Sequence, residues 1–210
     1  KSTLRGFELY TAILDFDDRP DLDRPNGVWP MESVEAAELA KLADTVYRNV
    51  NIGLANEFAV FSETIGVDVY DVIAAANSQP NSHIHRPGVA VGGHCIPVYP
   101  KFYLSNDPTA VIPAAAIDAN EAMPRHAVDT ILRRFGDLAN QKVAVLGAAY
   151  RGGVKEVAFS GVFPLVEYLL SLGAQVVVHD PLFTDEELNA LELSPHRIGE
   201  GCDVAIVQAD

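Results

Sequence analysis

The sequence predicts an α/β fold in which an all-helical central region, built on one long helix, is followed by a partial doubly wound parallel sheet. Two observations predict this order. Apolar and small residues recur at helical spacing over residues 33–65. After Lys142, short apolar runs alternate with a helical segment, which is the strand–helix–strand order of a parallel sheet. We therefore expect a connecting segment, 1–30, a helical domain, 31–137, and a sheet domain, 138–210.

The composition excludes several classes of protein. The 210 residues carry 15 basic and 29 acidic side chains, and the net charge of −14 opposes nonspecific binding to nucleic acid or to an anionic membrane. We expect neither a membrane span, which needs roughly 20 uncharged apolar residues, nor a secretion signal. Cys95 and Cys202 form no CxxC pair, so we expect two reduced thiols in a cytoplasmic protein.

Residues 1–30 are predicted to be an irregular surface connection, because a short apolar run is followed by an acidic stretch broken by prolines, 15–27. The long helix begins at Ser33, whose hydroxyl can cap it, and ends before Gly66. An α-helix of about 32 residues is about 48 Å long, which outruns a small core. We therefore expect part of the helix 33–65 to pack on another domain or on a second copy of the chain.

The remaining elements follow from the same two kinds of spacing. The predicted helices are 67–75, a turn at 100–104, 112–135 and 161–172, and the predicted strands are 143–146, 175–180 and 203–207. Pro113 is tolerated in the first turn of its helix, and Ser160 and Gly173 suit the two ends of the last helix. The chain ends directly after its third strand, so we expect a partial Rossmann-like domain and a piece of a longer protein.

Residues 87–97, PGVAVGGHCIP, form a loop that carries a cysteine and is called the cysteine loop below. Gly92 and Gly93 allow positive φ angles and close approach to a ligand, while the two prolines fix where the loop starts and ends. A thiol on a rigid, open loop suits covalent catalysis on a carbonyl. From the residues alone, an inert buried cysteine and a metal ligand stay open as alternatives.

Lys41, Thr45 and Arg48 lie four and three residues apart, so they share one face of the long helix. This face is either a solvated charged stripe or the wall of a cleft in which Lys41 stabilises negative charge on an oxygen or a thiol. Small and apolar neighbours on both sides of Lys41 favour the second interpretation.

The connection after the first strand, 147–153, is rich in glycine and contains Arg151. It is not a GxGxxG motif, so it either meets a nucleotide phosphate through its amides and Arg151 or is an ordinary glycine-rich connection. Asp180 either binds a ribose hydroxyl or caps the turn before Pro181. The loop histidines and Cys95 fit no zinc-ligand spacing, so we expect no metal.

Two motifs resemble those of one enzyme family. The helix sequence EAAELAK (35–41), continued by YRNVNIGLANE (47–57), and the cysteine loop through GGHCIP are similar to the central domain of the UDP-glucose/GDP-mannose dehydrogenases. The sequences of these two motifs are most similar to those of the UDP-N-acetyl-D-mannosaminuronate dehydrogenase branch. The segments 145–151 and 179–181 resemble that family's C-terminal UDP-binding domain.

The resemblance implies an NAD-dependent, two-step oxidation of the C6 alcohol of a UDP-sugar, a UDP-N-acetyl-hexosamine, to a uronate. In that chemistry Cys95 attacks the C6 aldehyde, a second hydride transfer gives a thioester, and water hydrolyses it. Lys41 matches the lysine that stabilises the oxyanion, and Thr45 is expected to hold a water. The helix 33–65 matches the family's dimer core, so a homodimer is expected. The expected substrate-binding residues are Gly92, Gly93, His94, Tyr150, Arg151 and Arg48.

The sequence departs from the family pattern at three positions. The family often has Asn where this chain has Thr45, Asp where it has Tyr99 and Arg where it has Ala158. Because that Asp is usually assigned to the catalytic water, the hydrolysis step has no assigned base in this chain. No GxGxxG occurs, so we expect an N-terminal domain ahead of these residues to bind NAD and the isolated piece to be inactive.

Two other functions stay open. A two-electron dehydrogenase of the hydroxyacid type uses a central lysine but needs no cysteine nucleophile. A noncatalytic module for dimerisation and nucleotide binding is the alternative outside the enzymes, and the absence of the aspartate at Tyr99 favours it.

Overall fold

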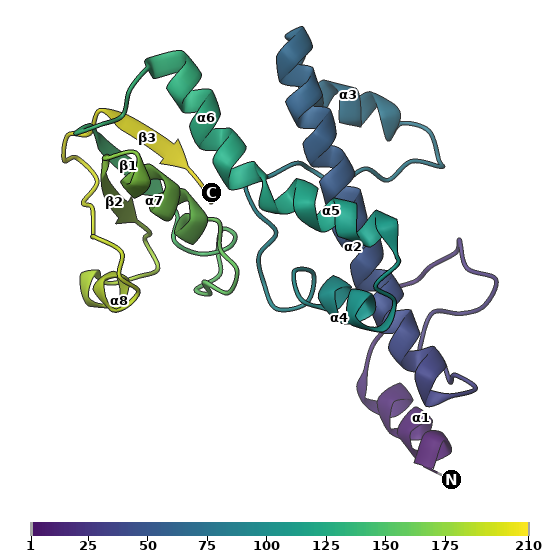
Figure 1. Cartoon of the computed structure of the whole chain (residues 1–210). Helices are drawn as coiled ribbons and strands as arrows, with labels where there is room; N and C mark the ends of the chain where they lie inside the picture. The colour runs from purple at the N-terminus through teal and green to yellow at the C-terminus, as the bar shows by residue number, and fades with distance from the viewer. Residues whose placement is uncertain (1, 210) are drawn as a thin grey trace. The chain divides into compact units, whose positions relative to one another are not determined.

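The computed structural model describes residues 2–209 of the chain (Figure 1). These residues form two compact units, of which the first ends at Lys41 and the second begins at Leu42. The boundary falls inside one continuous helix, so each unit is described by itself. No helix of the described residues is long and apolar enough to cross a membrane.

The first unit contains helix α1, Ser2–Ile13, where an irregular connection was expected. That expectation is wrong because no proline interrupts the segment before Pro20 and its one glycine, Gly6, is tolerated inside the helix. None of the residues of α1 is buried, and Leu9 and Ile13 are among its exposed apolar side chains. Helix α1 therefore lacks the buried stripe from which sequence periodicity predicts a helix.

Helix α2, Val34–Ile65, confirms the predicted long helix. At its start, the Ser33 hydroxyl accepts a hydrogen bond from the amide of Ala36 at 3.1 Å, as a capping serine should. Gly66 follows its last residue with a φ of 73°, a conformation that costs glycine nothing. The two ends of the helix are thus set by the two residues that predicted them.

The shorter helices of the second unit are α3, Val69–Ala76, α4, Tyr99–Asn106, α5, Val111–Glu121, and α6, Met123–Phe135. Helices α5 and α6 replace the single helix predicted over 112–135, so that prediction is wrong at Ala122. The cause is Pro124, which has no amide hydrogen to continue the ladder and starts α6 in its first turn instead.

A small parallel sheet confirms the predicted sheet region. Its elements are β1, Lys142–Leu146, α7, Val162–Ser171, β2, Gln175–His179, α8, Asp185–Ala190, and β3, Val204–Val207. The strand order is β2-β1-β3, and Val143 is in register with Val176 on one side and with Val204 on the other. The chain passes from β1 to β2 on one side and then to β3 on the other, so the direction in which strands are added switches at β1. Sheets of this kind bind ligands beyond the carboxyl ends of the strands at this switch point.

The core of this region lies where α7 packs against the sheet (Figure 1). Val143 and Val145 of β1 are fully buried, as are Leu165 and Leu169 one turn apart on α7. Val128 of α6 joins the same cluster. The helical region is therefore tied to the sheet through α6 as well as through the cysteine loop.

Replacing Leu165 by alanine is expected to lower the free energy of unfolding by about 2–5 kcal/mol, because the lost methyl groups leave a cavity in this cluster. Leu170 on the same helix is 54% exposed, so Leu170→Ala is the matched control and should cost less than about 1 kcal/mol. Urea unfolding of both variants measures the difference, and equal losses would contradict the assigned packing of α7.

Candidate active site

Cys95 lies near the end of the cysteine loop, four residues before the start of α4. Its thiol is free and its side chain is half-buried. Its carbonyl accepts hydrogen bonds from the amides of Val98 at 3.2 Å and Tyr99 at 2.9 Å, which start the helical turn of α4. The backbone at the thiol is therefore fixed on its C-terminal side by a helix rather than by more loop.

The glycine pair in front of Cys95 packs directly on the connection that follows β1. A Cβ added at Gly92 would stand 2.3 Å from the Cβ of Tyr150, closer than two carbon atoms can come. Gly93 has a φ of 87°, and its amide donates to the carbonyl of Ala158 at 2.8 Å. The glycine pair therefore approaches the protein's own sheet region closely, while the predicted approach to a ligand stays a prediction.

His94 reaches the same connection through its side chain. Its Nε2 lies 3.1 Å from Oε2 of Glu156, whose other oxygen accepts from the amide of Ala158 at 2.9 Å. The hydrogen bond from His94 is the main reason that the pKa of Glu156 lies below its ordinary value, and the Ala158 amide adds to it. Gly92, Gly93 and His94 thus form three consecutive contacts with one segment.

The residues just before α7 pack against the earlier part of the cysteine loop. A Cβ added at Gly161, which precedes α7, would meet the Cβ of Ala90 at 3.0 Å and a methyl group of Val89 at 3.4 Å. Ser160, predicted to cap α7, stands one residue too early, because the N-cap is Gly161. The Ser160 hydroxyl donates instead to the carbonyl of Ala149 at 3.2 Å and accepts from the amide of Val162.

Asp180 resolves one of the open alternatives in favour of a structural role. One of its oxygens accepts from the amides of Ala148 and Ala149 at 2.8 and 3.0 Å, and the other accepts from the amide of Leu182 at 2.9 Å. The carboxylate is almost completely buried. It therefore occupies the amides after β1 that a nucleotide phosphate would otherwise meet.

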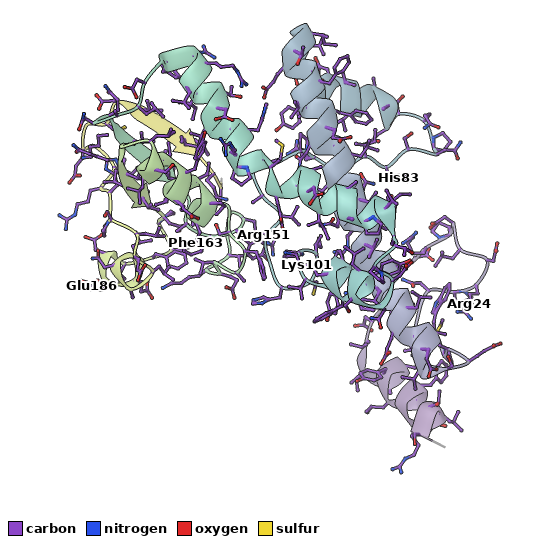
Figure 2. All side chains as sticks on the ribbon, viewed as in Figure 1. Arg24, His83, Lys101, Arg151, Phe163 and Glu186 are labelled. Carbon is purple, nitrogen blue, oxygen red and sulfur yellow. The ribbon has the colours of Figure 1, made fainter. Side chains whose placement is uncertain are left out.

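Arg151 projects from the same connection, outside the sheet (Figure 2). Its guanidinium is exposed, and its Nε donates to the hydroxyl of Tyr150 at 3.1 Å. Because the ring of Tyr150 also contacts Gly93, the cation stands one side chain away from the glycine pair. The structure thus brings five of the predicted residues together: Gly92, Gly93, His94, Tyr150 and Arg151.

The three residues that were predicted to share one face of the long helix lie in different surroundings. Thr45 is fully buried and its hydroxyl donates to the carbonyl of Leu42 at 3.0 Å. Arg48 pairs with Asp44 at 2.7 Å in a partly exposed i, i+4 ion pair. Lys41 belongs to the first unit, where it lines a cavity of about 680 Å³.

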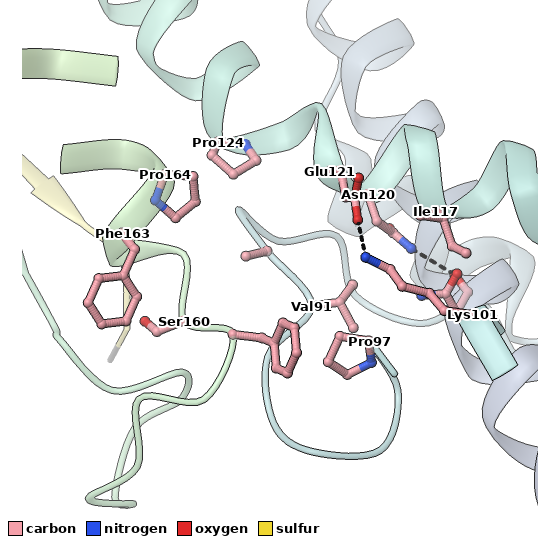
Figure 3. A pocket seen from close by; sticks show the side chains of 13 residues that line it. Val91, Pro97, Lys101, Ile117, Asn120, Glu121, Pro124, Ser160, Phe163 and Pro164 are labelled. Carbon is pink, nitrogen blue, oxygen red and sulfur yellow. Dashed lines mark hydrogen bonds and ion pairs between the residues drawn. The ribbon is translucent and has the colours of Figure 1, made fainter. Parts of the chain in front are cut away.

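A cavity of about 330 Å³ lies beside the cysteine loop (Figure 3). Val91 and Pro97 of the loop, Ile117 of α5 and Phe163 of α7 give it a mostly apolar lining. The ion pair between Lys101 and Glu121 at 2.9 Å is its charged feature. Cys95 does not line it, so this space lies alongside the loop and not at the thiol.

The residues that sequence reasoning missed are asparagines that hold the chain ahead of the loop. Asn77 donates to the carbonyl of Ile84 at 2.9 Å and accepts from its amide at 2.8 Å. Asn51 donates to the carbonyl of His83 at 2.7 Å and accepts from the amide of His85 at 2.8 Å. The signal for Asn51 was the occurrence of asparagine inside a helix, where it is otherwise unfavourable, whereas Asn77 is the C-cap of α3.

The expectation of no metal stays a prediction, although the described residues contain no group of three or more His, Cys, Asp or Glu side chains that could hold a metal ion.

Fold and site together define a two-part α/β protein in which a helical region presents a cysteine loop to the ligand-binding end of a parallel sheet. The chain belongs to the UDP-glucose/GDP-mannose dehydrogenase family. The family's central domain matches residues 35–124, and its UDP-binding domain matches residues 144–210.

Similar proteins are dehydrogenases of nucleotide sugars. The UDP-N-acetyl-D-mannosamine dehydrogenase of Methanococcus aeolicus is 36% identical over 162 residues, which are 75% of this chain and 37% of that protein. The solved UDP-D-ManNAc dehydrogenase of Pyrococcus horikoshii superposes with a TM-score of 0.71 at 33% identity, covering 83% of this chain and 42% of that one. A UDP-glucose dehydrogenase of Pyrobaculum islandicum gives 0.75 at 28% identity, covering 83% and 43%. The chain thus spans about two fifths of the length of these relatives.

Replacing His94 by alanine is expected to raise the pKa of Glu156 toward its ordinary value, because the hydrogen bond that lowers it most is lost. A carboxyl with a lowered folded pKa contributes stability above its unfolded pKa, about 4.3, and this contribution is lost as the pH falls through the folded pKa. The stability difference between wild type and His94→Ala should therefore be present near pH 6 and vanish in acid.

A carbon-detected NMR titration of the carboxyl groups measures this shift. Glu187 is the internal control, since its pKa is lowered mainly by Lys155 and should not respond to a change at position 94. An unchanged titration of Glu156 in the variant would show that the His94 contact is absent in solution.

Proposed function

We propose that this chain is the central and UDP-binding part of an NAD-dependent, cytoplasmic UDP-sugar 6-dehydrogenase that converts the C6 alcohol of a UDP-N-acetyl-hexosamine to a carboxylate. The observation that carries the proposal is the docking of the glycine pair, two residues before Cys95, on the connection after β1. It joins a thiol-bearing loop to the part of the chain that matches a UDP-binding domain. The names of the similar proteins supply the sugar class.

Cys95 is the proposed nucleophile. Its sulfur adds to the C6 aldehyde formed in the first oxidation, and the aldehyde oxygen takes up a proton to give a thiohemiacetal. Removal of a hydride from C6 and of the proton from its hydroxyl leaves a thioester. Water then cleaves the carbon–sulfur bond to release the carboxylate, a proton and the thiol. The thioester keeps the sugar attached between the second oxidation and hydrolysis.

The remaining catalytic roles are assigned to two residues of α2. Lys41 is proposed to stabilise the oxygen that becomes negative when the thiol adds to the carbonyl. Thr45 is proposed to hold a water on the resemblance alone, since its hydroxyl donates to the carbonyl of Leu42. Hydrolysis has no assigned base, because Tyr99 stands where an aspartate would be expected.

The UDP-sugar is proposed to bind where the cysteine loop meets the sheet. Arg151 would pair with the diphosphate, with Tyr150 and His94 beside it. The glycine pair is assigned to the sugar on the resemblance alone, since it packs on Tyr150. Arg48 is assigned to the substrate on the resemblance alone, since its guanidinium pairs with Asp44.

NAD does not fit the connection after β1. Its amides bond to Asp180, and a dinucleotide's pyrophosphate would meet a carboxylate where it needs donors. We therefore derive no hydride-transfer step from the described residues and assign the cofactor to sequence outside these 210 residues.

Cys95→Ala in the protein as it is encoded, with any sequence that flanks these residues, is expected to abolish uronate formation. The wild type should produce two NADH per UDP-sugar consumed, because both oxidations pass through the same site. NADH absorbance and product mass measure both quantities. Cys202→Ala is the control, since Cys202 is exposed and free and lies outside the loop, and it should retain full activity.

The same assay separates the two alternatives. One NADH per substrate with an unaffected Cys95→Ala variant would favour a two-electron dehydrogenase. No NADH with any UDP-sugar, together with calorimetric binding of UDP to this chain, would favour a noncatalytic binding module.

A homodimer through α2 is the proposed assembly. Tyr47, Leu54 and Phe61 are exposed and spaced seven residues apart, so they form one apolar stripe along the helix. A second copy of the same helix is a partner that could cover such a stripe symmetrically.

Phe61→Lys is expected to convert a dimer into a monomer at micromolar concentration, because it places a charge in the proposed contact. Sedimentation velocity measures the change. Val72→Lys on α3 makes the same exchange at an exposed apolar residue away from the stripe and should leave the dimer intact. A well-folded wild-type monomer at high micromolar concentration would rule the assembly out.

A further inference from the structure

Three buried asparagines form a chain of hydrogen bonds across the helical part of the second unit. Asn49 and Asn56 come from α2 and Asn120 comes from α5, and each is less than 5% exposed. Nδ2 of Asn56 donates to Oδ1 of Asn120 at 2.8 Å, and Nδ2 of Asn120 donates to the backbone carbonyl of Asn49 at 3.0 Å. Buried amides are costly unless paired, so the side chains of Asn56 and Asn120 fix each other's positions and are tied to the backbone at Asn49.

The crossing of two helices brings these residues together. A Cβ at Gly53 of α2 would meet the backbone of Ala116 of α5 at 3.2 Å, so the two helices touch at small residues. Asn49 and Asn56 lie about one turn on either side of Gly53, and Asn120 lies one turn after Ala116. A larger residue at the crossing would separate the two helices and break the hydrogen bonds between the asparagines.

The asparagines at both ends of this series of hydrogen bonds also bind the cysteine loop. Oδ1 of Asn56 accepts from the amide of Gly88 at 2.9 Å. At the other end, Nδ2 of Asn49 reaches the carbonyl of Ile96 in a long contact of 3.5 Å. The bonded loop groups therefore stand on either side of the glycine pair and Cys95.

We propose that Asn49, Asn56 and Asn120, named here the asparagine relay, are positioning residues that hold the two ends of the cysteine loop and so fix the orientation of Cys95. None of the three contacts the thiol, and all act through the backbone at Gly88 and Ile96. The importance of this orientation for turnover rests on the proposed function, whereas the relay itself is measured without any substrate.

The test compares Asn120→Asp with the wild type, both in a Cys202→Ser background, through the rate at which 2,2′-dipyridyl disulfide modifies Cys95. The ionised carboxylate accepts from Asn56 but cannot donate to the Asn49 carbonyl. We expect the Cys95 rate to rise at least five-fold at pH 7.5. As the pH falls, the buried carboxyl becomes protonated and donates again, so the ratio to wild type should return toward one.

Two controls separate positioning from general destabilisation. Leu165→Ala destabilises the sheet core, and Asn51→Ala removes a clamp ahead of the loop that is not part of the relay. Both should leave the Cys95 rate within two-fold of wild type. A two-fold or smaller effect of Asn120→Asp, the same rise in Leu165→Ala, or no recovery in acid would overturn the proposal.

A measurement on the wild type covers the case in which Asn120→Asp does not fold. Hydrogen exchange of the Gly88 amide should be as slow as that of the α2 amides, since its acceptor is buried. Exchange at the rate of an open loop would overturn the relay. If exchange and thiol rates behave as expected while no UDP-sugar is oxidised, the relay stands and the proposed function fails.

Discussion

The close approach of Gly92 to Tyr150 is the contact on which the rest of the site depends. There is no room for a Cβ between them, so the backbone of the cysteine loop itself forms the surface that meets the sheet region. The Gly93 amide and the His94 ring then add two polar contacts to the same segment. Because Cys95 follows directly, a shift in the connection after β1 reaches the thiol without an intervening element to absorb it.

An irregular segment placed between helices must find partners for its backbone groups, since unpaired buried amides and carbonyls are costly. Residues 83–97 have no strand beside them, and asparagine side chains take the place of one. Helix α2 carries three of these asparagines, Asn49, Asn51 and Asn56, although the residue lowers helix stability. This loss of helix stability is offset because the asparagine side chains form the hydrogen bonds with the loop backbone that a neighbouring strand would otherwise form.

Local patterns predicted what local forces determine. The long helix and the strands were predicted because their periodicity lies within the sequence window that forms them. The break between two helices at Ala122 was missed, although Pro124 is a residue that signals a helix start. Helix α1 was missed because none of its side chains is buried. The glycine pair was recognised from backbone freedom alone. The roles of Asn56 and Asn120, and the bonds of Asp180 to the amides after β1, were beyond sequence reasoning, because the partners lie 31 to 71 residues away along the chain.

The buried Asp180 carboxylate changes how an anionic ligand can be recognised in this sheet. In many parallel sheets the amides after the first strand bind phosphate, but here they bind an internal anion. A diphosphate approaching that turn would be repelled by the carboxylate and by an overall charge of −14. In the proposed site its attraction would come from side chains outside the turn, such as Arg151, whose guanidinium donates to the hydroxyl of Tyr150. In the proposed function, recognition of the nucleotide would therefore rest on side chains at the rim of the first connection, next to the glycine pair, and not on its backbone.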